Sequence, residues 1–405
     1  MKEENSFPSI KSSSALDELD SPQLGEDAVE SSWHNVIKRR SFLKGISLAG
    51  ATVTAGGLIG TQLSAQTKGN SRRLSKDDAA LLRFAAAAEL IEADLWQQYN
   101  EFGGVEGGNP AYIAALSNLD GDMPQYISDN TDDELSHAAF LNAYLISRGA
   151  EPVDLDAFRT LPSSQATGAK NIGRLTNLLK LNVDLSWYTR YRSQKNPDLG
   201  AQFKGPFTIA NQPAIPISDA DTPPDTVIPT ASSQTPGSSF TGAAARMQLI
   251  ANTAGFHFAF IEQGGASLYP TLAFKAKDPE VLRILVSIGG VEIDHFGLWH
   301  DKGGNAVAQP LALVSDPITG FTFPDLNAVN SELDQTNLIL PEPCSFINNN
   351  LPQCSVIRPT TTRKGGAVAT IKAFTEDLLF HGQSNEFFSF VSQLAVAADS
   401  VPGGF

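Results

Sequence analysis

Two single glutamates and two Glu-x-x-His pairs recur along the chain in a fixed order. In each pair the histidine follows the glutamate by three residues, so on a helix both side chains leave one face and can meet at one point. Helices that bring two single glutamates and two such pairs into a bundle core build a di-iron or di-manganese carboxylate site. The pattern therefore predicts six metal ligands: Glu92, Glu134, His137, Glu262, Glu292 and His295.

The charge of this set fits two divalent metal ions. Its four carboxylates carry four negative charges, which two divalent ions would balance. Without the ions, four buried carboxylates would repel one another and take up protons. A mixed set of carboxylates and imidazoles suits iron or manganese, and zinc stays open. Glu134 and Glu292 are the best candidates for bridging ligands, because each shares a helix face with its own histidine.

The repetition makes the pattern specific. Of six histidines in the chain, only His137 and His295 have a glutamate three residues before them. A single pair of this kind is more often a solvated helix face. Each pair also follows a segment in which a tyrosine, Tyr99 or Tyr269, stands seven residues after the single glutamate. These tyrosines either pack in the core or hydrogen-bond ligands and relay electrons. The alternative to a metal site is a metal-free bundle that descends from metal proteins.

Other polar residues near the pattern have simpler explanations. Glu89 stands one turn before Glu92, but its counterpart in the second repeat is Ala259. We therefore expect Glu89 to be a supporting or exposed acid rather than a ligand. His257 and His300 do not keep the spacing of the pattern, and we expect His300 at the surface.

Five glycines flank the second half of the pattern, although each costs a helix about 1 kcal/mol relative to alanine. They indicate either close helix packing or space beside the metals for oxygen, peroxide or a small substrate. These residues are Gly264, Gly265, Gly289, Gly290 and Gly297.

The elements that carry these residues are predicted to be helices. Helical patterns occupy residues 77–102, 131–148, 170–192, 241–268, 278–301 and 366–397, with a capping box at Thr131 and Glu134 and a start signal at Asp278. Residues 196–240 are rich in Pro, Ser, Thr and Asp and predict a long loop. The fold class is therefore all-α. We expect a four-helix bundle over 77–301 with a crossover insertion at 150–240, and an irregular extension at 303–405 that ends in a helix.

The composition limits the classes of function. The chain has 405 residues, 41% of them hydrophobic, which is enough for a sizeable core. The net charge is −15 and the sequence contains no basic stripe, so we expect no nucleic-acid partner. We find no Ser-His-Asp set, no phosphate-binding loop and no dinucleotide fingerprint, so the catalytic residues stay unknown.

The N-terminal segment predicts export. Residues 1–37 are polar, carry eight acidic residues and predict a disordered leader. Residues 38–65 begin with Lys38-Arg39-Arg40-Ser41-Phe42-Leu43-Lys44, and no charge follows until Lys68. Twin arginines before a mildly apolar stretch indicate a twin-arginine signal peptide, although a lysine stands where Ser or Thr is usual; the alternative is a chance basic patch. We expect a periplasmic or extracellular mature protein that starts near Gln66 and has no stable membrane anchor.

The two cysteines, Cys344 and Cys354, lie in a short segment rich in Pro and Asn. Disulfides persist in exported proteins, so we predict that these cysteines form one. The alternative is a pair of unrelated buried thiols.

The chain resembles the ferritin-like superfamily, and more closely its exported ferritin-like domain family. This group includes plant desiccation-related proteins and fungal stress-response or sexual-development proteins. The resemblance covers residues 77–301, and Val183-Asp184-Leu185-Ser186-Trp187-Tyr188-Thr189-Arg190-Tyr191-Arg192 with Asn196-Pro197-Asp198 is similar to the fungal branch. It implies a ferritin-like bundle in which the six residues of the pattern are the ligands. The long crossover and the C-terminal extension depart from compact ferritins and argue against a storage cage.

Three classes of function agree with this pattern. The first is a di-metal oxidoreductase that handles oxygen or peroxide in stress protection. The second is a stress protein that sequesters metal. The third is a metal-free helical bundle that protects the cell envelope or binds partners. The sequence leaves the metal, the substrate and the oligomeric state open.

Overall fold

The computed structural model describes residues 73–184, 208–231, 240–307, 309–325, 341–342, 347–348, 350–352, 354–355 and 362–403. These residues all belong to one compact unit, Asn70–Phe405. The predicted leader and signal peptide lie outside the described residues. Cys344 also lies outside them, so the disulfide with Cys354 stays a prediction.

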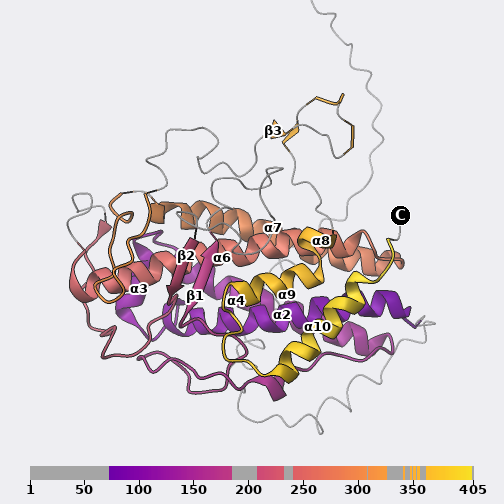
Figure 1. Cartoon of the computed structure of the whole chain (residues 1–405), viewed down its shortest axis with the longest axis horizontal. Helices are drawn as coiled ribbons and strands as arrows, with labels where there is room; N and C mark the ends of the chain where they lie inside the picture. Colours follow the sequence, from indigo (N-terminus) through magenta and orange to yellow (C-terminus); the bar gives the residue numbers. More distant parts are fainter. Residues whose placement is uncertain are drawn as a thin grey trace, which may run out of the picture. The chain divides into compact units, whose positions relative to one another are not determined.

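Four long helices dominate the described part of the chain (Figure 1). They are α2 (Lys76–Gly103), α4 (Met123–Ser147), α6 (Gly242–Ala273) and α7 (Pro279–Gly304). Helix α2 packs mainly against α4, and α6 mainly against α7. The fold is therefore mainly helical, as the sequence predicts.

Local signals set the ends of these helices. The Ser75 side chain accepts a hydrogen bond from the backbone of Asp78 and caps the start of α2. The Asp278 side chain caps α7 in the same way and is followed by a proline in the first turn. At the end of α2, a Cβ on Gly103 would lie 2.5 Å from Leu116, so only glycine lets the next helix approach. The two side-chain caps fix where the glutamates and the histidine of α2 and α7 fall along their helices, whereas α4 and α6 begin without such a cap.

Shorter elements surround the long helices. Helix α3 (Pro110–Ser117) follows α2, and the 3-10 turn η1 (Asp156–Phe158) follows α4. The 3-10 turn η3 (Asn305–Val307) continues α7. Strands β1 (Leu181–Asp184) and β2 (Thr208–Gln212) pair antiparallel beside α6, with Val183 opposite Ile209. Strands β3 (Pro341–Glu342) and β4 (Cys354–Ser355) form a second small ladder. Helices α8 (Thr362–Gly365), α9 (Ala367–Glu376) and α10 (Asn385–Asp399) end the described chain, and α10 packs on α2.

The predicted helix at 170–192 is wrong over its described part. From 170 to 180 the backbone bonds to distant segments instead of to its own previous turn. The buried carboxylate of Asp94 accepts hydrogen bonds from the backbone of Leu175 and Thr176, and Asn177 donates to the carbonyl of Leu379. The chain then enters strand β1. Residues 185–192 lie outside the described residues.

Two predicted helix boundaries also change. Helix α4 begins at Met123 rather than at Thr131, whose hydroxyl donates to the carbonyl of Ile127 inside the helix and caps nothing. The predicted final helix at 366–397 is two helices, α9 and α10, separated by a turn. In that turn Leu378 and Gly382 have positive φ angles of 65° and 99°, which a continuous helix excludes.

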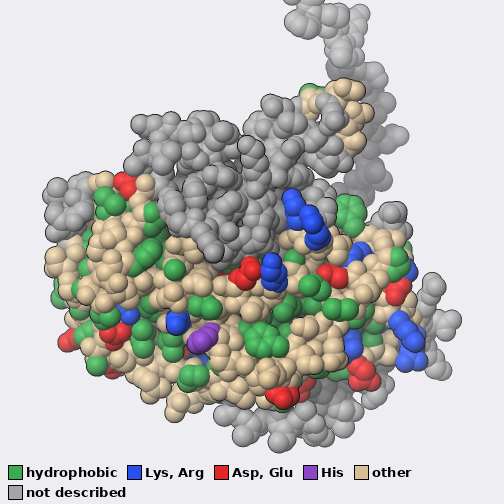
Figure 2. Space-filling view, viewed as in Figure 1, with side chains coloured by type: hydrophobic (Ala, Val, Ile, Leu, Met, Phe, Trp, Pro, Cys, Tyr) green, Lys and Arg blue, Asp and Glu red, His purple; other side chains and the backbone are tan. Residues whose placement is uncertain are grey.

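Within the described residues, no helix is both long and apolar enough to cross a lipid bilayer. On the face drawn in Figure 2, charged side chains of both signs lie singly or in small groups between hydrophobic and neutral ones. The strongest concentration of acidic groups is instead internal, among the four long helices.

Candidate metal centre

All four long helices supply acidic or imidazole groups to one buried cluster. Helix α2 carries two glutamates, α4 and α7 each carry a Glu-x-x-His pair, and α6 carries one glutamate. The five carboxylates are at most 5% exposed, and the two imidazole side chains are 10% and 11% exposed. We call these residues the Glu/His cluster: Glu89, Glu92, Glu134, His137, Glu262, Glu292 and His295.

Six of the seven cluster residues supply ligand atoms to two groups. Within each group, the ligand atoms lie within 4.8 Å of one another. The first group contains Glu89, Glu134, His137 and Glu292, and the second contains Glu134, Glu262, Glu292 and His295. Glu134 and Glu292 belong to both groups. The buried carboxylates and imidazoles are therefore positioned to hold a metal ion.

The imidazole of His137 faces the carboxylates of the first group. Its Nδ1 lies 3.3 Å from Glu89 Oε2, 3.2 Å from Glu134 Oε2 and 3.6 Å from Glu292 Oε1. Because all four atoms converge, a cation placed among them would have three oxygen donors and one nitrogen donor.

The imidazole of His295 faces the second group. Its Nδ1 lies 3.1 Å from Glu134 Oε1 and 3.3 Å from Glu262 Oε2. Glu134 thus turns one oxygen toward each histidine. The other ring nitrogen of His295 lies 3.1 Å from Asp133, which orients Nδ1 toward the cluster.

Several buried carboxylate oxygens of the cluster have no hydrogen-bond donor. They are one oxygen each of Glu89, Glu92 and Glu262 and both oxygens of Glu292. A buried polar atom without a partner costs about 1–3 kcal/mol, and more when it is charged. Metal ions supply the missing positive charge without needing a proton, so the donor set fits divalent cations.

Burial and mutual repulsion disturb the protonation of the cluster. Burial raises the pKa of Glu292 well above its ordinary value, and the charges of Glu134 and Glu92 add to this. Burial and the charge of Glu89 raise the pKa of Glu134 to about 7. Burial alone would lower the pKa of His137, but hydrogen bonds and charges of Glu134 and Glu89 outweigh it and raise the pKa to about 10. Without metal the cluster therefore retains protons that metal ions would displace.

Neutral side chains hold the second group in place. Asn130 donates hydrogen bonds to Glu134 and Glu262 at 2.8 and 3.1 Å, and its carbonyl oxygen accepts from the indole of Trp299 at 2.6 Å. The indole of Trp96 donates to Glu262 at 3.0 Å. In the first group the hydroxyl of Tyr269 donates to Glu89. These donors fix the carboxylate orientations and leave the remaining oxygens directed at the cluster.

Five of the six predicted ligands meet in the two groups, and the sixth lies beside them. Glu92 is buried but belongs to neither group. Burial raises its pKa well above the ordinary value, and the charges of Glu134 and Glu262 raise it further, which shows that Glu92 lies near the cluster carboxylates. Glu89, which we expected to be a supporting or exposed acid, is fully buried and belongs to the first group. The signal for it was its position one turn before Glu92 on the same helix face. The second repeat has Ala259 at the corresponding position, which argued against Glu89 as a ligand.

The remaining predictions near the site have mixed outcomes. His300 is only 1% exposed, so its predicted surface position is wrong; its ring packs edge-on against Phe296, one turn earlier on α7, at 5.6 Å between ring centroids. Gly265 and Gly289 serve close packing. A Cβ at Gly265 would overlap the carboxylate of Glu292, and one at Gly289 would lie 2.6 Å from Tyr269. A Cβ at Gly290 would meet no atom within 4 Å.

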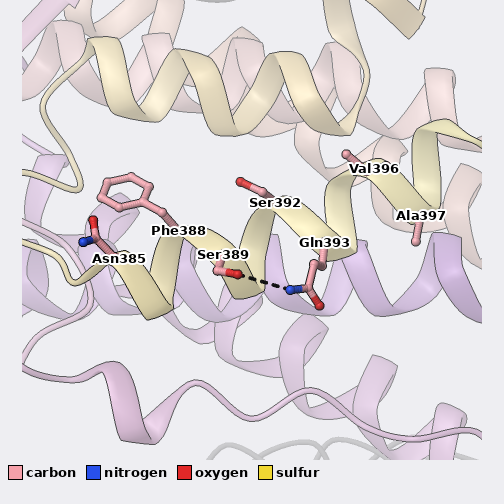
Figure 3. A pocket seen from close by; sticks show the side chains of 7 residues that line it. All are labelled: Asn385, Phe388, Ser389, Ser392, Gln393, Val396 and Ala397. Atoms are coloured by element: carbon pink, nitrogen blue, oxygen red, sulfur yellow. Dashed lines mark hydrogen bonds between the residues drawn. The ribbon is translucent and has the colours of Figure 1, made fainter.

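A surface hollow of about 680 Å³ lies along α10 (Figure 3). Its lining includes Phe388, Val396 and the hydrogen-bonded pair Ser389 and Gln393, but none of the cluster residues. The lining contains no acidic, basic or imidazole side chain. The hollow therefore adds no titratable group to those of the buried cluster.

In comparisons with known proteins, no family model, curated protein or solved structure matches the chain. The fold and the site define a mainly helical protein with buried Glu/His groups positioned to hold metal.

Proposed function

We propose that this protein is an exported ferritin-like protein with a carboxylate-bridged site for two iron or manganese ions, and that it handles oxygen or peroxide in stress protection. The observation that carries the proposal is the sharing of two carboxylates. Glu134 and Glu292 each belong to both groups of ligand atoms, as bridging ligands of a two-ion site would.

Each ion would have its own set of ligands beside these two bridges. Glu89 and His137 would bind one ion, and Glu262 and His295 would bind the other. Glu92 stays a proposed ligand because it is buried, adjacent and carries an oxygen without a donor. The four long helices, joined by a long crossover between α4 and α6, support the ferritin-like arrangement.

Iron or manganese ions in such a site supply redox chemistry with oxygen or peroxide. The cluster side chains would bind the metal ions, their hydrogen-bond partners would orient those side chains, and the surrounding core would exclude water. Burial of the carboxylates strengthens every electrostatic interaction within the cluster. Asn130 and Trp96 keep Glu262 directed inward, and Tyr269 does the same for Glu89.

The test is metal analysis of the purified protein after loading with Fe²⁺ or Mn²⁺, followed by an absorption spectrum with added peroxide. We expect about two ions per chain and consumption of peroxide or oxygen. Negligible metal in the loaded protein would exclude the site and favour a metal-free protective bundle. Bound metal without turnover would exclude the oxidoreductase and leave metal sequestration.

Export is tested separately, because the signal segment lies outside the described residues. Replacing Arg39 and Arg40 by lysine should retain the precursor inside the cell. Fractionation and immunoblotting measure this, with a Lys38→Ser variant, which moves toward the usual signal pattern, as the control that should still be exported. A mature protein outside the cytoplasm in the double-lysine variant would contradict the twin-arginine assignment.

A further inference from the structure

Three buried titratable side chains form a hydrogen-bonded chain beside the cluster. The hydroxyl of Tyr99 on α2 lies 2.6 Å from Nδ1 of His257 on α6, and Nε2 of His257 lies 2.9 Å from Asp377 at the end of α9. All three side chains are fully buried. In the tautomer that carries its proton on Nε2, His257 donates to Asp377 and accepts from Tyr99. The three groups do not belong to the Glu/His cluster, so its metal chemistry leaves them unexplained.

The indole of Trp96 connects these three hydrogen-bonded side chains to the Glu/His cluster. The rings of Tyr99 and Trp96 have centroids 5.7 Å apart, and the indole of Trp96 donates to Glu262. Trp96 also stacks on Trp299 at 5.3 Å, whose indole bonds to Asn130 next to Glu134. Contacts between aromatic rings at these separations allow an electron to pass from Tyr99 to the cluster in two short steps.

We propose that Tyr99 is a redox-active tyrosine that supplies an electron to the metal centre through Trp96 and its phenolic proton to His257. This inference rests on the proposed function, whose oxidant is oxygen or peroxide reduced at the centre. Once oxygen or peroxide had oxidised the bound metal, Trp96 would lose one electron to the centre, and Tyr99 would restore that electron to Trp96. The O–H bond of Tyr99 breaks, its proton moves to Nδ1 of His257, and the proton on Nε2 moves to Asp377. A neutral tyrosyl radical remains, and Asp377 becomes neutral, so the net charge of the triad changes from −1 to 0, in balance with the one electron that leaves it.

The surroundings suit this proton movement. Burial lowers the pKa of His257 to about 3, which keeps the imidazole neutral and able to accept from Tyr99. Burial raises the pKa of Asp377 well above its ordinary value, which makes its carboxylate a stronger base toward the proton on Nε2 of His257. A phenol releases its electron far more easily when a base 2.6 Å away takes the proton in the same step.

The other buried tyrosines lack this combination. Tyr112 is fully buried, but its hydroxyl donates to the carbonyl oxygen of Ala214, which is a poor base. Tyr269 donates to Glu89, a ligand candidate, and thereby positions that carboxylate. Among these three, Tyr99 alone pairs an imidazole with a neighbouring indole. Tyr112→Phe is therefore the matched control.

The experiment is ultraviolet laser photoionisation of tryptophan in the metal-free full-length protein, with absorption recorded over time. Each tryptophan radical formed by loss of an electron should decay as a tyrosyl radical appears. We expect this growth to be lost in Tyr99→Phe and retained in Tyr112→Phe. In His257→Gln, which keeps the contact with Trp96 but removes the base, the growth should slow and lose its solvent deuterium isotope effect. Circular dichroism verifies that each variant is folded.

Unchanged tyrosyl growth in Tyr99→Phe, or none in the wild type, would overturn the inference. Unchanged kinetics in His257→Gln would overturn the assignment of the proton acceptor. Because the photoionisation experiment needs no metal, its outcome is independent of the proposed function. A second arm mixes the iron-loaded protein with oxygen or peroxide and records the electron paramagnetic resonance spectrum, where Tyr99→Phe should lose a tyrosyl signal. If the protein binds no metal, the proposed function fails while the photochemical result stands.

Discussion

Replacing Glu292 by glutamine should change stability in opposite directions with and without metal. Glu292 is fully buried, both of its oxygens lack hydrogen-bond donors, and burial with the neighbouring charges raises its pKa well above its ordinary value. Glutamine keeps nearly the same shape without a charge. In the metal-free protein, Glu292→Gln should therefore increase the free energy of unfolding by about 1–2 kcal/mol, because one unpaired buried carboxylate disappears.

With metal, the sign reverses. A ligand present at about 100 times its dissociation constant stabilises the folded state by about 2.7 kcal/mol per site. The unit Asn70–Phe405 has an unfolding entropy of about 0.7 kcal/mol/K, at about 2.1 cal/mol/K per residue, so this corresponds to a rise in the unfolding midpoint of roughly 4 °C per site. Glu292 belongs to both groups of ligand atoms, so its loss should weaken both binding positions. We expect the midpoint rise on metal addition to fall to less than half in Glu292→Gln.

Differential scanning calorimetry with and without Mn²⁺ measures both effects, and elemental analysis counts the ions. Glu386→Gln is the control, because Glu386 is exposed in the first turn of α10 and should change neither quantity. Glu101 is a less suitable control, since it forms an ion pair with the buried guanidinium of Arg174. An equal metal-induced rise in wild type and Glu292→Gln would refute the reasoning about shared ligands.

Three further predictions concern the same site. Above pH 7, the folded metal-free protein keeps protons that the unfolded chain releases, because the pKa of His137 is raised from 6.5 to about 10. Its stability should therefore fall as the pH rises from about 7 to 10, which urea titrations at several pH values measure; rising stability would contradict the assigned ion pairs. Asn130→Ala removes the donor that orients two carboxylates and should weaken metal binding by roughly 10-fold or more in a metal titration, whereas unchanged affinity would exclude an orienting role. Gly265→Ala should displace the Glu292 carboxylate and destabilise the protein by about 1–3 kcal/mol. Gly290→Ala, with open space, should stabilise it by up to about 1 kcal/mol, and equal effects of the two would argue against the predicted overlap.

Most of the helical framework follows from local sequence signals. Helices α2 and α7 begin and end close to the predicted limits because their caps and glycines lie at their ends. Helix α6 begins as predicted but continues through Pro270 to Ala273, beyond the predicted end at residue 268. The segment after residue 170 could not be predicted, since its backbone bonds to Asp94 and to Leu379, which are distant in sequence. Its leucines have helical spacing, but long-range partners decide its conformation. The pattern of apolar residues alone carries no information about such partners.

The candidate site shows the same division between local and distant information. Helical spacing alone placed Glu134 with His137 and Glu292 with His295, because each pair lies within one turn. The choice between Glu89 and Glu92 depends on the rotation of α2 and on Tyr269, which comes from another helix and donates to Glu89. No spacing within α2 contains that information.

The two halves of the cluster are not equivalent, although the ligand pattern repeats along the chain. Near the first group, the neutral side chain of Tyr269 bonds to Glu89. Near the second, Asn130 and the indole of Trp96 both bond to Glu262, and Trp96 leads on to Tyr99. A repeat that only bound metal would need no such difference, because the same ligand types already stand in both halves. In the proposed electron transfer this difference gives one half a path for electrons, because Trp96 in α2 corresponds to Ala266 in α6, which has no ring.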